Sequence, residues 1–349
     1  MSLPLEIWLT IFESTFRDDK QTLLSLALVS RAFHGAVLPL LYSDVQITGR
    51  ERQQRFYRWI QSESPSNPAL YIREYTIIIT NSDVASGKPY THNSGALARM
   101  QHLRKLTLLG EPDDGKFLAT NTILQSEDPS WSLPELRELR WADRGIELEL
   151  CRFFLRCPAI EHLELPQWAA TVSPPTGTLS NLRSISGDGT TAVAFLCGRH
   201  IVDIELTSAV GLVIVDDYFT SNPDSAARIR SFSIPPLYFR FEEGHLESIL
   251  LHLPHLKQLR MGTTQSRKVE SQTDLLRGLE KLVLYNKLIG TAPHFKARMR
   301  ISVRHMRNLS STPLGRGNTK PCLELWDTEY KMLLRWRRSE DGTRLELVK

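Results

Sequence analysis

A short apolar pattern recurs along the middle of the 349-residue chain and restricts the folds open to it. It has the form apolar-x-x-apolar-x-apolar, and Leu103-Leu106-Leu108 is one clear copy. The last two apolar positions alternate with polar residues, as they do in a strand with one buried face. The first residues of the nine copies are Ile72, Leu103, Leu136, Ile160, Leu182, Ile201, Ile229, Leu256 and Leu279. Recurrence of this kind predicts stacked units that share a continuous core.

The segments ahead of some copies have a helical pattern and are followed by proline. Residues 149–156 and 242–252 carry apolar side chains at helical spacing. Proline then stands two residues before the next copy, at Pro134, Pro158 and Pro254. Because proline disfavours helix in the residue ahead of it, each unit is expected to be helix, proline stop and short strand. The fold class is therefore α/β, with a conventional α/β domain of parallel strands as the alternative.

The spacing of the copies points to one repeat family. Their first residues follow one another at intervals of 19 to 33 residues, which straddle the leucine-rich repeat range. Residues 65–305 resemble a leucine-rich repeat array. That family places Asn or Cys three positions after the last leucine, and the seven full copies have neither residue there. We therefore expect an irregular solenoid with uneven curvature.

The first forty-odd residues predict three short helices. Ile7 and Ile11 continue the spacing of Leu3, and Pro4 stands in the first turn, where a missing N–H costs little. Asp18 with Gln21 predicts a capping box that starts the second helix. Ser30 is expected to cap the third helix, and Pro39 to end or bend it. Residues 42–47 predict a strand.

Two runs in this segment carry a second resemblance. Residues 3–12 read LPLEIWLTIF and residues 23–33 read LLSLALVSRAF, and together they resemble an F-box. The resemblance covers residues 3–47 and implies docking on the Skp-type adaptor of a cullin–RING ubiquitin ligase. Carried over residue by residue, the expected adaptor contacts are Leu3, Pro4, Ile7, Ile11, Leu26, Val29, Ser30 and Phe33. The alternative is that these helices only cap the apolar end of the array.

The expected organisation has three parts. They are an F-box-like helical domain (1–47), an irregular leucine-rich repeat array (48–305) and a basic cap (306–349). The expected function is that of a substrate-recruiting F-box subunit of an SCF-type ligase, a non-catalytic adaptor that binds an unknown protein substrate on the concave strand face. The alternatives are a repeat scaffold independent of ubiquitin and, less favoured, a nucleic-acid-binding protein.

The substrate candidates are the outward residues of the strands. In a strand the side chains beside the buried positions point to the opposite face. The sign of the charge changes along this row, from mixed to acidic to basic. The candidates are Arg140, His162, Glu164, Asp203, Glu205, Arg260 and Tyr285.

Composition and motifs argue against several other classes. Four cysteines without a CxxC pair predict reduced thiols and a cytoplasmic or nuclear protein. The run 23–41 is interrupted by polar residues, so no membrane span is expected. His252 and His255 flank Pro254 and do not share a helical face, so no metal site is expected. Residues 187–191 are glycine-rich but lack the lysine of a phosphate loop, which predicts a turn. No cofactor is expected.

The C-terminal end is basic. Residues 290–349 contain 13 Lys+Arg and 6 Asp+Glu, a net charge of +7 that could meet an acidic partner. Residues 335–338 are expected to form an edge strand, which turns at Asp341-Gly342 into residues 345–348.

Overall fold

The computed structural model divides into two compact units, Met1–Leu182 and Arg183–Lys349, which are described separately. Beyond residue 260 it describes the strands by their backbone alone. The described residues are 4–16, 19–62, 67–80, 93–110, 131–142, 147–165, 168, 172, 174–175, 177–208, 211–234, 245–262, 281–286, 322–327, 332–338 and 345–348. This division differs from the three predicted domains, which remain a prediction.

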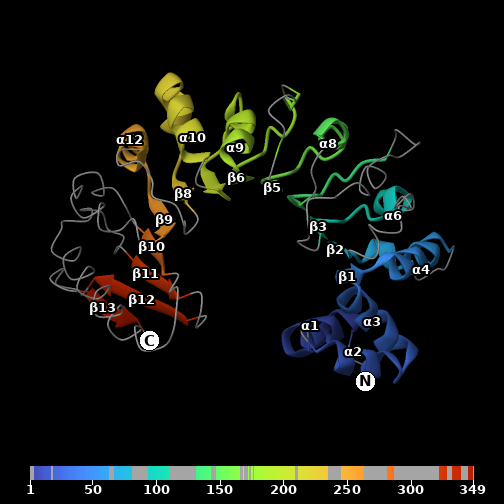
Figure 1. Cartoon of the computed structure of the whole chain (residues 1–349). Coiled ribbons are helices and arrows are strands. Elements are labelled where there is room, and N and C mark those ends of the chain that lie inside the picture. Colours follow the sequence, from blue (N-terminus) through green and yellow to red (C-terminus); the bar gives the residue numbers. More distant parts are fainter. Residues whose placement is uncertain are drawn as a thin grey trace. The chain divides into compact units, whose positions relative to one another are not determined.

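The first unit begins with three helices and continues as alternating strands and helices (Figure 1). Its helices are α1 (Leu5–Phe16), α2 (Lys20–Ala27), α3 (Arg31–Leu41), α4 (Arg50–Gln61), the 3₁₀ helix η1 (Pro68–Leu70), α6 (Asn93–Arg99) and α8 (Glu147–Phe154). Its strands are β1 (Asp44–Thr48), β2 (Glu74–Ile79), β3 (Lys105–Gly110), β4 (Glu138–Trp141) and β5 (His162–Leu165). From β1 to β5, neighbouring strands in sequence pair in parallel within this unit.

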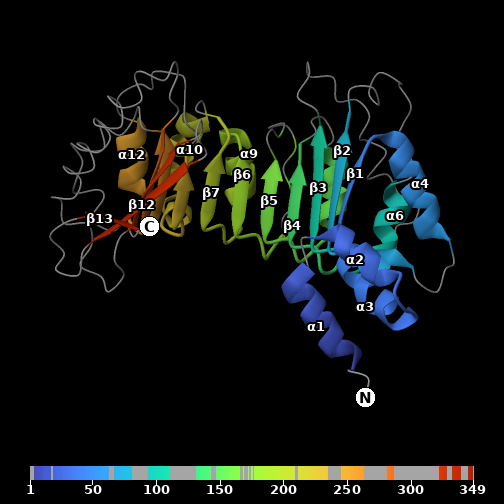
Figure 2. The ribbon, with the colours of Figure 1, turned by 90° about the horizontal axis from the view of Figure 1, so that it is seen from below.

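The second unit repeats the same alternation of strands and helices and then ends in antiparallel strands. Its helices are α9 (Gly189–Leu196), α10 (Gly211–Ser221), α11 (Pro223–Ala226) and α12 (His245–His252). Its strands are β6 (Ser184–Gly187), β7 (Asp203–Leu206), β8 (Ser231–Ser233), β9 (Gln258–Gly262), β10 (Lys281–Asn286), β11 (Cys322–Asp327), β12 (Met332–Arg338) and β13 (Leu345–Val348). Strands β6 to β11 pair in parallel, whereas β12 and β13 are antiparallel additions (Figure 2).

The repeating pattern predicts the strands correctly. Each of the nine copies forms one strand, β2 to β10, and each strand begins two residues after the first apolar residue of its copy. The alternation explains the burial, because Tyr75, Ile77 and Ile79 of β2 are buried while the residues between them are not. Figure 2 shows α4 and α6 on one side of β1–β3, so the intervening side chains face away from these helices.

Three details of the N-terminal helices differ from the prediction or refine it. The N-cap of α2 is Asp19 and not Asp18, because the helix begins at Lys20 and the Asp19 carboxylate accepts from Thr22 N–H at 3.0 Å. Asp18 lies outside the described residues. Ser30 caps α3 as predicted and accepts from Phe33 N–H. Pro39 does not end α3, which continues to Leu41.

Two further predictions need correction. Residues 187–191 were expected to form only a turn, but Asp188 is the N-cap of α9 and accepts from Thr191 N–H at 2.8 Å. The strand that contains residues 335–338, β12, is not an edge strand, because it pairs with both β11 and β13. The predicted pairing of β12 with residues 345–348 is confirmed, and the turn between them lies outside the described residues.

Helices α9 and α10 meet at their first residues. A Cβ on Gly189 would lie 2.2 Å from the carbonyl oxygen of Gly211 and 2.3 Å from its Cα. A Cβ on Gly211 would lie 2.4 Å from the nitrogen of Gly189. Such distances are far inside van der Waals contact, so glycine at both positions is what lets the two backbones approach.

No helix in the described part of the chain has the length and apolarity that crossing a bilayer requires.

Candidate binding surfaces

The N-terminal helices enclose a small aromatic core. Phe12, Leu23, Ala36 and Val37 are buried at its centre. The Trp8 and Phe33 rings close it, with centroids 4.8 Å apart and edge-to-face geometry. Trp8 and Phe33 therefore face inward, although Phe33 is only half-buried. Three helices of this length bury little area, so their core is small for the number of large apolar residues that they carry.

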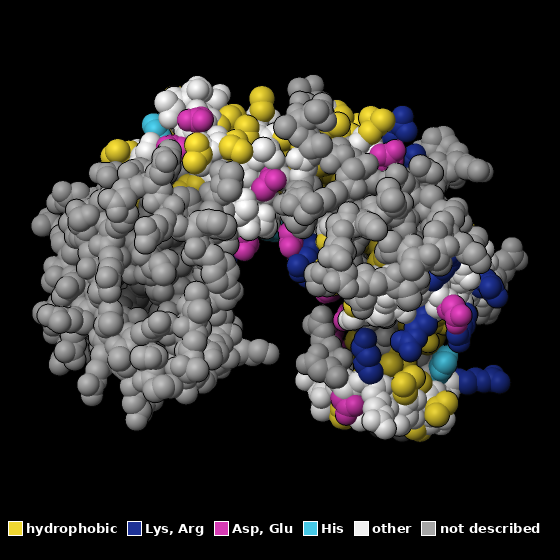
Figure 3. All heavy atoms as spheres, viewed as in Figure 1, with side chains coloured by type: hydrophobic (Ala, Val, Ile, Leu, Met, Phe, Trp, Pro, Cys, Tyr) yellow, Lys and Arg dark blue, Asp and Glu magenta, His cyan; other side chains and the backbone are white. Residues whose placement is uncertain are grey.

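The same helices leave five large apolar side chains exposed to solvent. Their exposed fractions are Ile7 45%, Ile11 38%, Leu24 55%, Leu28 88% and Val29 65%. We call these five residues the exposed apolar set. They lie within 23 positions of one another in sequence. Figure 3 shows hydrophobic side chains on the surface of these helices, next to Lys and Arg side chains. Single exposed apolar residues are ordinary, but their concentration on three short helices makes these helices a candidate interaction surface.

The predicted adaptor contacts divide into two groups. Pro4, Ile7, Ile11 and Val29 are exposed and available for contact. Leu26 and Phe33 are half-buried, and Ser30 is a helix cap, so these three shape the bundle.

Two exposed residues were not predicted, and one predicted residue is not described. Sequence analysis missed Leu24 and Leu28 as surface residues because two i, i+4 apolar pairs lie side by side in this segment, Leu23 with Ala27 and Leu24 with Leu28. The sequence alone does not show which pair faces the core. Leu3 lies outside the described residues.

In the first unit, the sheet face that no described helix covers, here called the helix-free sheet face, carries charges that pair across strands. Lys105 Nζ lies 3.2 Å from Glu138 Oε2, and Arg140 Nε lies 2.9 Å from Glu164 Oε1. The register explains both contacts, since Lys105 stands opposite Glu138 and Arg140 opposite Glu164 on neighbouring strands. Of the predicted substrate residues, Arg140 and Glu164 are thus brought together. His162 is exposed on the same face, opposite Glu138.

The corresponding face of the second unit places carboxylates among hydroxyl groups. Asp203 of β7 stands between Ser184 and Ser231 on the flanking strands. Glu205 stands between Ser186 and Ser233 in the same way and is exposed. The short serine side chains leave the Glu205 carboxylate open to water on this face.

Two predicted substrate residues lie further along this sheet. Arg260 of β9 stands opposite Ser233 of β8, two strands away from the carboxylates of β7. Tyr285 lies in β10 opposite Gly262 and Trp326, and its side chain lies outside what the structure describes.

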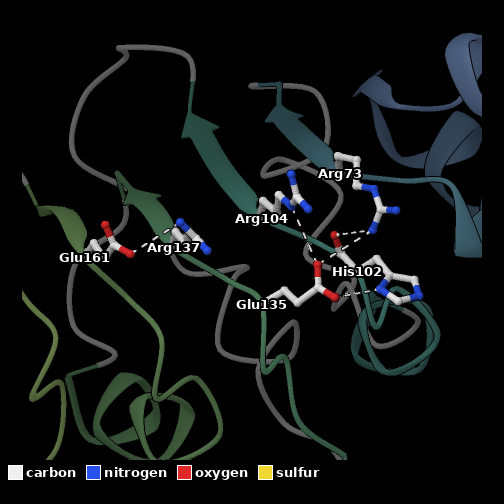
Figure 4. A network of polar contacts seen from close by, with 6 residues as sticks. All are labelled: Arg73, His102, Arg104, Glu135, Arg137 and Glu161. Atoms are coloured by element: carbon white, nitrogen blue, oxygen red, sulfur yellow. Dashed lines mark hydrogen bonds and ion pairs between the residues drawn. The ribbon is translucent and has the colours of Figure 1, made fainter.

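A polar network runs along the edge where the strands of the first unit begin (Figure 4). The Glu135 carboxylate lies 2.8 Å from His102 Nδ1, 3.6 Å from Arg104 Nε and 3.8 Å from Arg73 Nη1. The hydrogen bond with His102, followed by the charges of His102, Arg73 and Arg104, lowers the pKa of Glu135. Arg137 pairs with Glu161 at 3.6 Å further along the edge.

Sequence analysis did not single out this network, although a signal was present. The residue after the first apolar position is basic in most copies, as at Arg73, Arg104 and Arg137. In a stacked repeat such a column lies along one edge of the sheet, and acidic residues near it become its partners.

Arginines of the second unit contact main-chain carbonyls at the strand starts, as Arg73 of the first unit also does with the His102 carbonyl at 3.2 Å. Arg230 Nη1 donates to the carbonyls of Ala227 and His255, at 3.1 and 3.3 Å. Arg228 donates to the carbonyl of Arg199 in the preceding repeat. These bonds satisfy main-chain oxygens in the turns between helix and strand.

Two groups with nucleophilic or metal-binding chemistry, the Cys157 thiol and the Asp216 carboxylate with His252, are engaged in packing. Burial raises the pKa of the Cys157 thiol, which disfavours its thiolate form. The carboxylate of Asp216 accepts from Ser248 Oγ at 2.8 Å, and His252 Nε2 lies 3.9 Å from it. No group of three or more His, Cys, Asp or Glu side chains that could hold a metal ion occurs among the described residues.

Comparisons with known proteins leave the family open. No family model matches the chain, and no curated protein matches it. A solved structure of a structural-genomics protein from Bacteroides fragilis is 13% identical and covers 74% of this chain and 72% of its own, with a TM-score of 0.38. A likeness this weak carries no argument about fold or function.

Proposed function

We propose that the chain is an F-box-like, substrate-recruiting subunit of an SCF-type cullin–RING ubiquitin ligase. In this proposal α1 to α3 are the F-box-like bundle and the strands that follow form an irregular leucine-rich repeat array. The chain binds a Skp-type adaptor through the N-terminal helices and a protein substrate through the helix-free sheet face, in the cytoplasm or nucleus. Transfer of ubiquitin is left to other subunits, and this chain contributes no catalytic residue.

The exposed apolar set is the observation that carries the proposal. Fully burying an exposed large apolar side chain is worth roughly 1.5–3 kcal/mol, and a partly exposed one such as Ile7 or Ile11 recovers a corresponding part of this. A protein partner that covers them recovers this free energy, and interface cores are built from such residues. The positions also agree with the F-box resemblance, since Ile7, Ile11 and Val29 belong to both groups.

The sheet face supports the substrate half of the proposal. Its charged and hydroxyl side chains stand in ordered rows on short parallel strands, which hold them at fixed spacings. A surface of this kind can bind an extended or folded protein segment by hydrogen bonds and charge pairing.

The test measures binding of the purified full-length chain to a purified Skp-type adaptor. We expect a 1:1 complex and a loss of affinity of at least about hundredfold for Ile7→Asp or Leu28→Asp, the range of a central interface residue. Leu70→Asp is the matched control, because Leu70 is 48% exposed in η1, outside the N-terminal helices. It should bind like the unaltered chain.

Two results would overturn the proposal. One is an unaltered chain that does not bind the adaptor. The other is an Ile7→Asp or Leu28→Asp variant that binds as well as Leu70→Asp. A chain that does not bind the adaptor but binds a cellular partner through the sheet face would instead be a scaffold independent of ubiquitin.

A further inference from the structure

Helix α4 has a buried side and a distinct solvent-facing side. Gln53 and Ile60 are buried, and the Phe56 ring stacks on Tyr75 of β2 with centroids 5.7 Å apart. Three arginines, Arg52, Arg55 and Arg58, are exposed, and Trp59 is 39% exposed. Their spacing of three, four and seven residues places Arg52, Arg55 and Trp59 on one side of the helix. We call Arg52, Arg55, Arg58 and Trp59 the outer face of α4.

The outer face has a surplus of positive charge. The acidic residue of this helix, Glu51, contacts Arg55 at 3.3 Å, with the two side chains 86% and 74% exposed. An exposed i, i+4 pair of this kind is worth only a few tenths of a kcal/mol, so an incoming carboxylate can compete with it. Figure 3 shows Lys and Arg side chains gathered over α4 and the neighbouring N-terminal helices.

The partly exposed indole of Trp59 adds apolar surface to this charged face of the helix. Its ring centroid lies 5.0 Å from that of Tyr42 and 6.0 Å from that of Phe56. These neighbours hold the indole in place while part of it remains in water. Arginine and tryptophan are the residue types most enriched among the side chains that dominate protein interfaces. A fixed, partly exposed indole among guanidinium groups is therefore suited to contact a large apolar side chain.

We propose that the outer face of α4 binds an acidic polypeptide segment that carries a large apolar side chain. Its carboxylates pair with Arg52, Arg55 and Arg58, and its apolar side chain covers Trp59. A single-stranded nucleic acid fits less well, because base stacking needs an open ring face and Trp59 already contacts two rings. Three guanidinium groups are also few for phosphate-driven affinity, which typically uses about six to ten contacts. This site is separate from the exposed apolar set and does not depend on the proposed function.

The experiment titrates the full-length chain into a fluorescent peptide that repeats Glu-Glu-Leu and follows anisotropy. A peptide that repeats Glu-Glu-Ser is the probe for charge alone. We expect the leucine peptide to bind at least about tenfold more tightly than the serine peptide, since indole contacts of interface residues are worth about 1–2 kcal/mol or more. Arg52→Ser with Arg55→Ser should weaken the leucine peptide about tenfold, as should Trp59→Ala.

Controls separate this site from others and from misfolding. Arg152→Ser removes an exposed arginine from α8 and should leave binding unchanged. Ile7→Asp should also leave it unchanged, which separates this site from the adaptor surface. If Trp59→Ala unfolds, the paired arginine variant still decides, because Arg52 and Arg55 are exposed and their loss does not open a core.

Three outcomes would overturn the proposal. The first is equal affinity for the leucine and serine peptides, and the second is an arginine pair variant that binds like Arg152→Ser. The third is tighter binding to single-stranded poly(dT), or to vesicles of phosphatidylserine and phosphatidylcholine, that the same variants abolish. That result would assign the outer face to a nucleic acid or a membrane surface.

Discussion

The two units of the chain build similar strands and, among the described side chains, differ in how many ion pairs they carry. In the first unit carboxylates pair with cations, both on the sheet face at Arg140–Glu164 and along the strand-start edge around Glu135. In the second unit Arg228 and Arg230 donate to main-chain carbonyls, and two helix starts touch through glycine. Among the described side chains the ion pairs are concentrated in the first unit, so we expect that part of the chain to respond to salt more strongly than the described part of the second unit.

The same contrast separates the two sheet faces as binding surfaces. A partner that binds the charged side chains of the first unit must compete with the existing cross-strand pairs, Lys105–Glu138 and Arg140–Glu164. Glu205, with serine on both flanking strands, offers its charge at lower cost. If the sheet face binds a substrate, the second unit should favour cationic groups more than the first.

The largest expected effect tests the backbone contact of the second unit. Gly189→Ala should destabilise the protein by about 1–3 kcal/mol or more, because its methyl group would overlap the backbone of Gly211. Gly35→Ala is the control, since a Cβ there meets nothing within 4 Å and alanine favours helix α3. Urea denaturation followed by circular dichroism measures both. Equal stability of the two variants would contradict the close approach of α9 and α10.

A smaller effect is expected at Arg230. Arg230→Ser removes two hydrogen bonds to turn carbonyls and should cost about 1–2 kcal/mol, the range for a bond from a charged donor that is partly exposed. The loss should be nearly independent of NaCl, because the acceptors are uncharged carbonyls. Arg183→Ser, at an exposed arginine of the same edge, should change stability by less than about 0.5 kcal/mol. A cost that vanishes in high salt would place Arg230 with the ion-paired arginines instead.

The pair Arg140–Glu164 tests the first unit directly. A double-mutant cycle with Arg140→Ala and Glu164→Ala should give a coupling free energy of about 0.2–1 kcal/mol at low salt. Raising the ionic strength should reduce this coupling. A coupling free energy of zero at every salt concentration would show that the contact between Arg140 and Glu164 does not contribute to stability.

The smallest effect concerns pH. The pKa of Glu135 is lowered in the folded protein, so its network stabilises the fold above the unfolded pKa and loses this contribution as pH falls through the folded value. Glu135→Gln should therefore cost less than about 1 kcal/mol at pH 7, because the carboxyl is partly exposed. In urea denaturation the difference between the two proteins should shrink in acid. A constant difference from neutral to acidic pH would count against the network.

The strands could be predicted from sequence because their signal is local. An apolar residue at fixed spacing is buried whichever neighbour covers it, so each copy identifies a strand and its start. Helix caps were also local, although Asp18 and Asp19 are both able to cap and the sequence does not choose between them. The boundary after Leu182 has no comparable signal, because Leu182 itself begins a copy of the repeat.

The candidate surfaces depend on which way side chains point, and that was only partly predictable. Leu23 and Leu24 are equally apolar in sequence, yet the first is completely buried and the second is 55% exposed. Their difference is set by how α2 rotates against α3, which no single residue encodes. The network around Glu135 joins residues 33 positions apart and requires the register of neighbouring repeats. The proposed adaptor and substrate contacts remain predictions.

The exposed apolar set also bears on how such a chain is kept in solution. Exposed apolar side chains on the first three helices favour self-association when no binding partner covers them. Copies of the chain can then aggregate or bind chaperones. A cell that makes more of this protein than it has partners to cover would see the surplus aggregate or be degraded. Under the proposed function, the supply of the adaptor would thereby set how much of the protein persists.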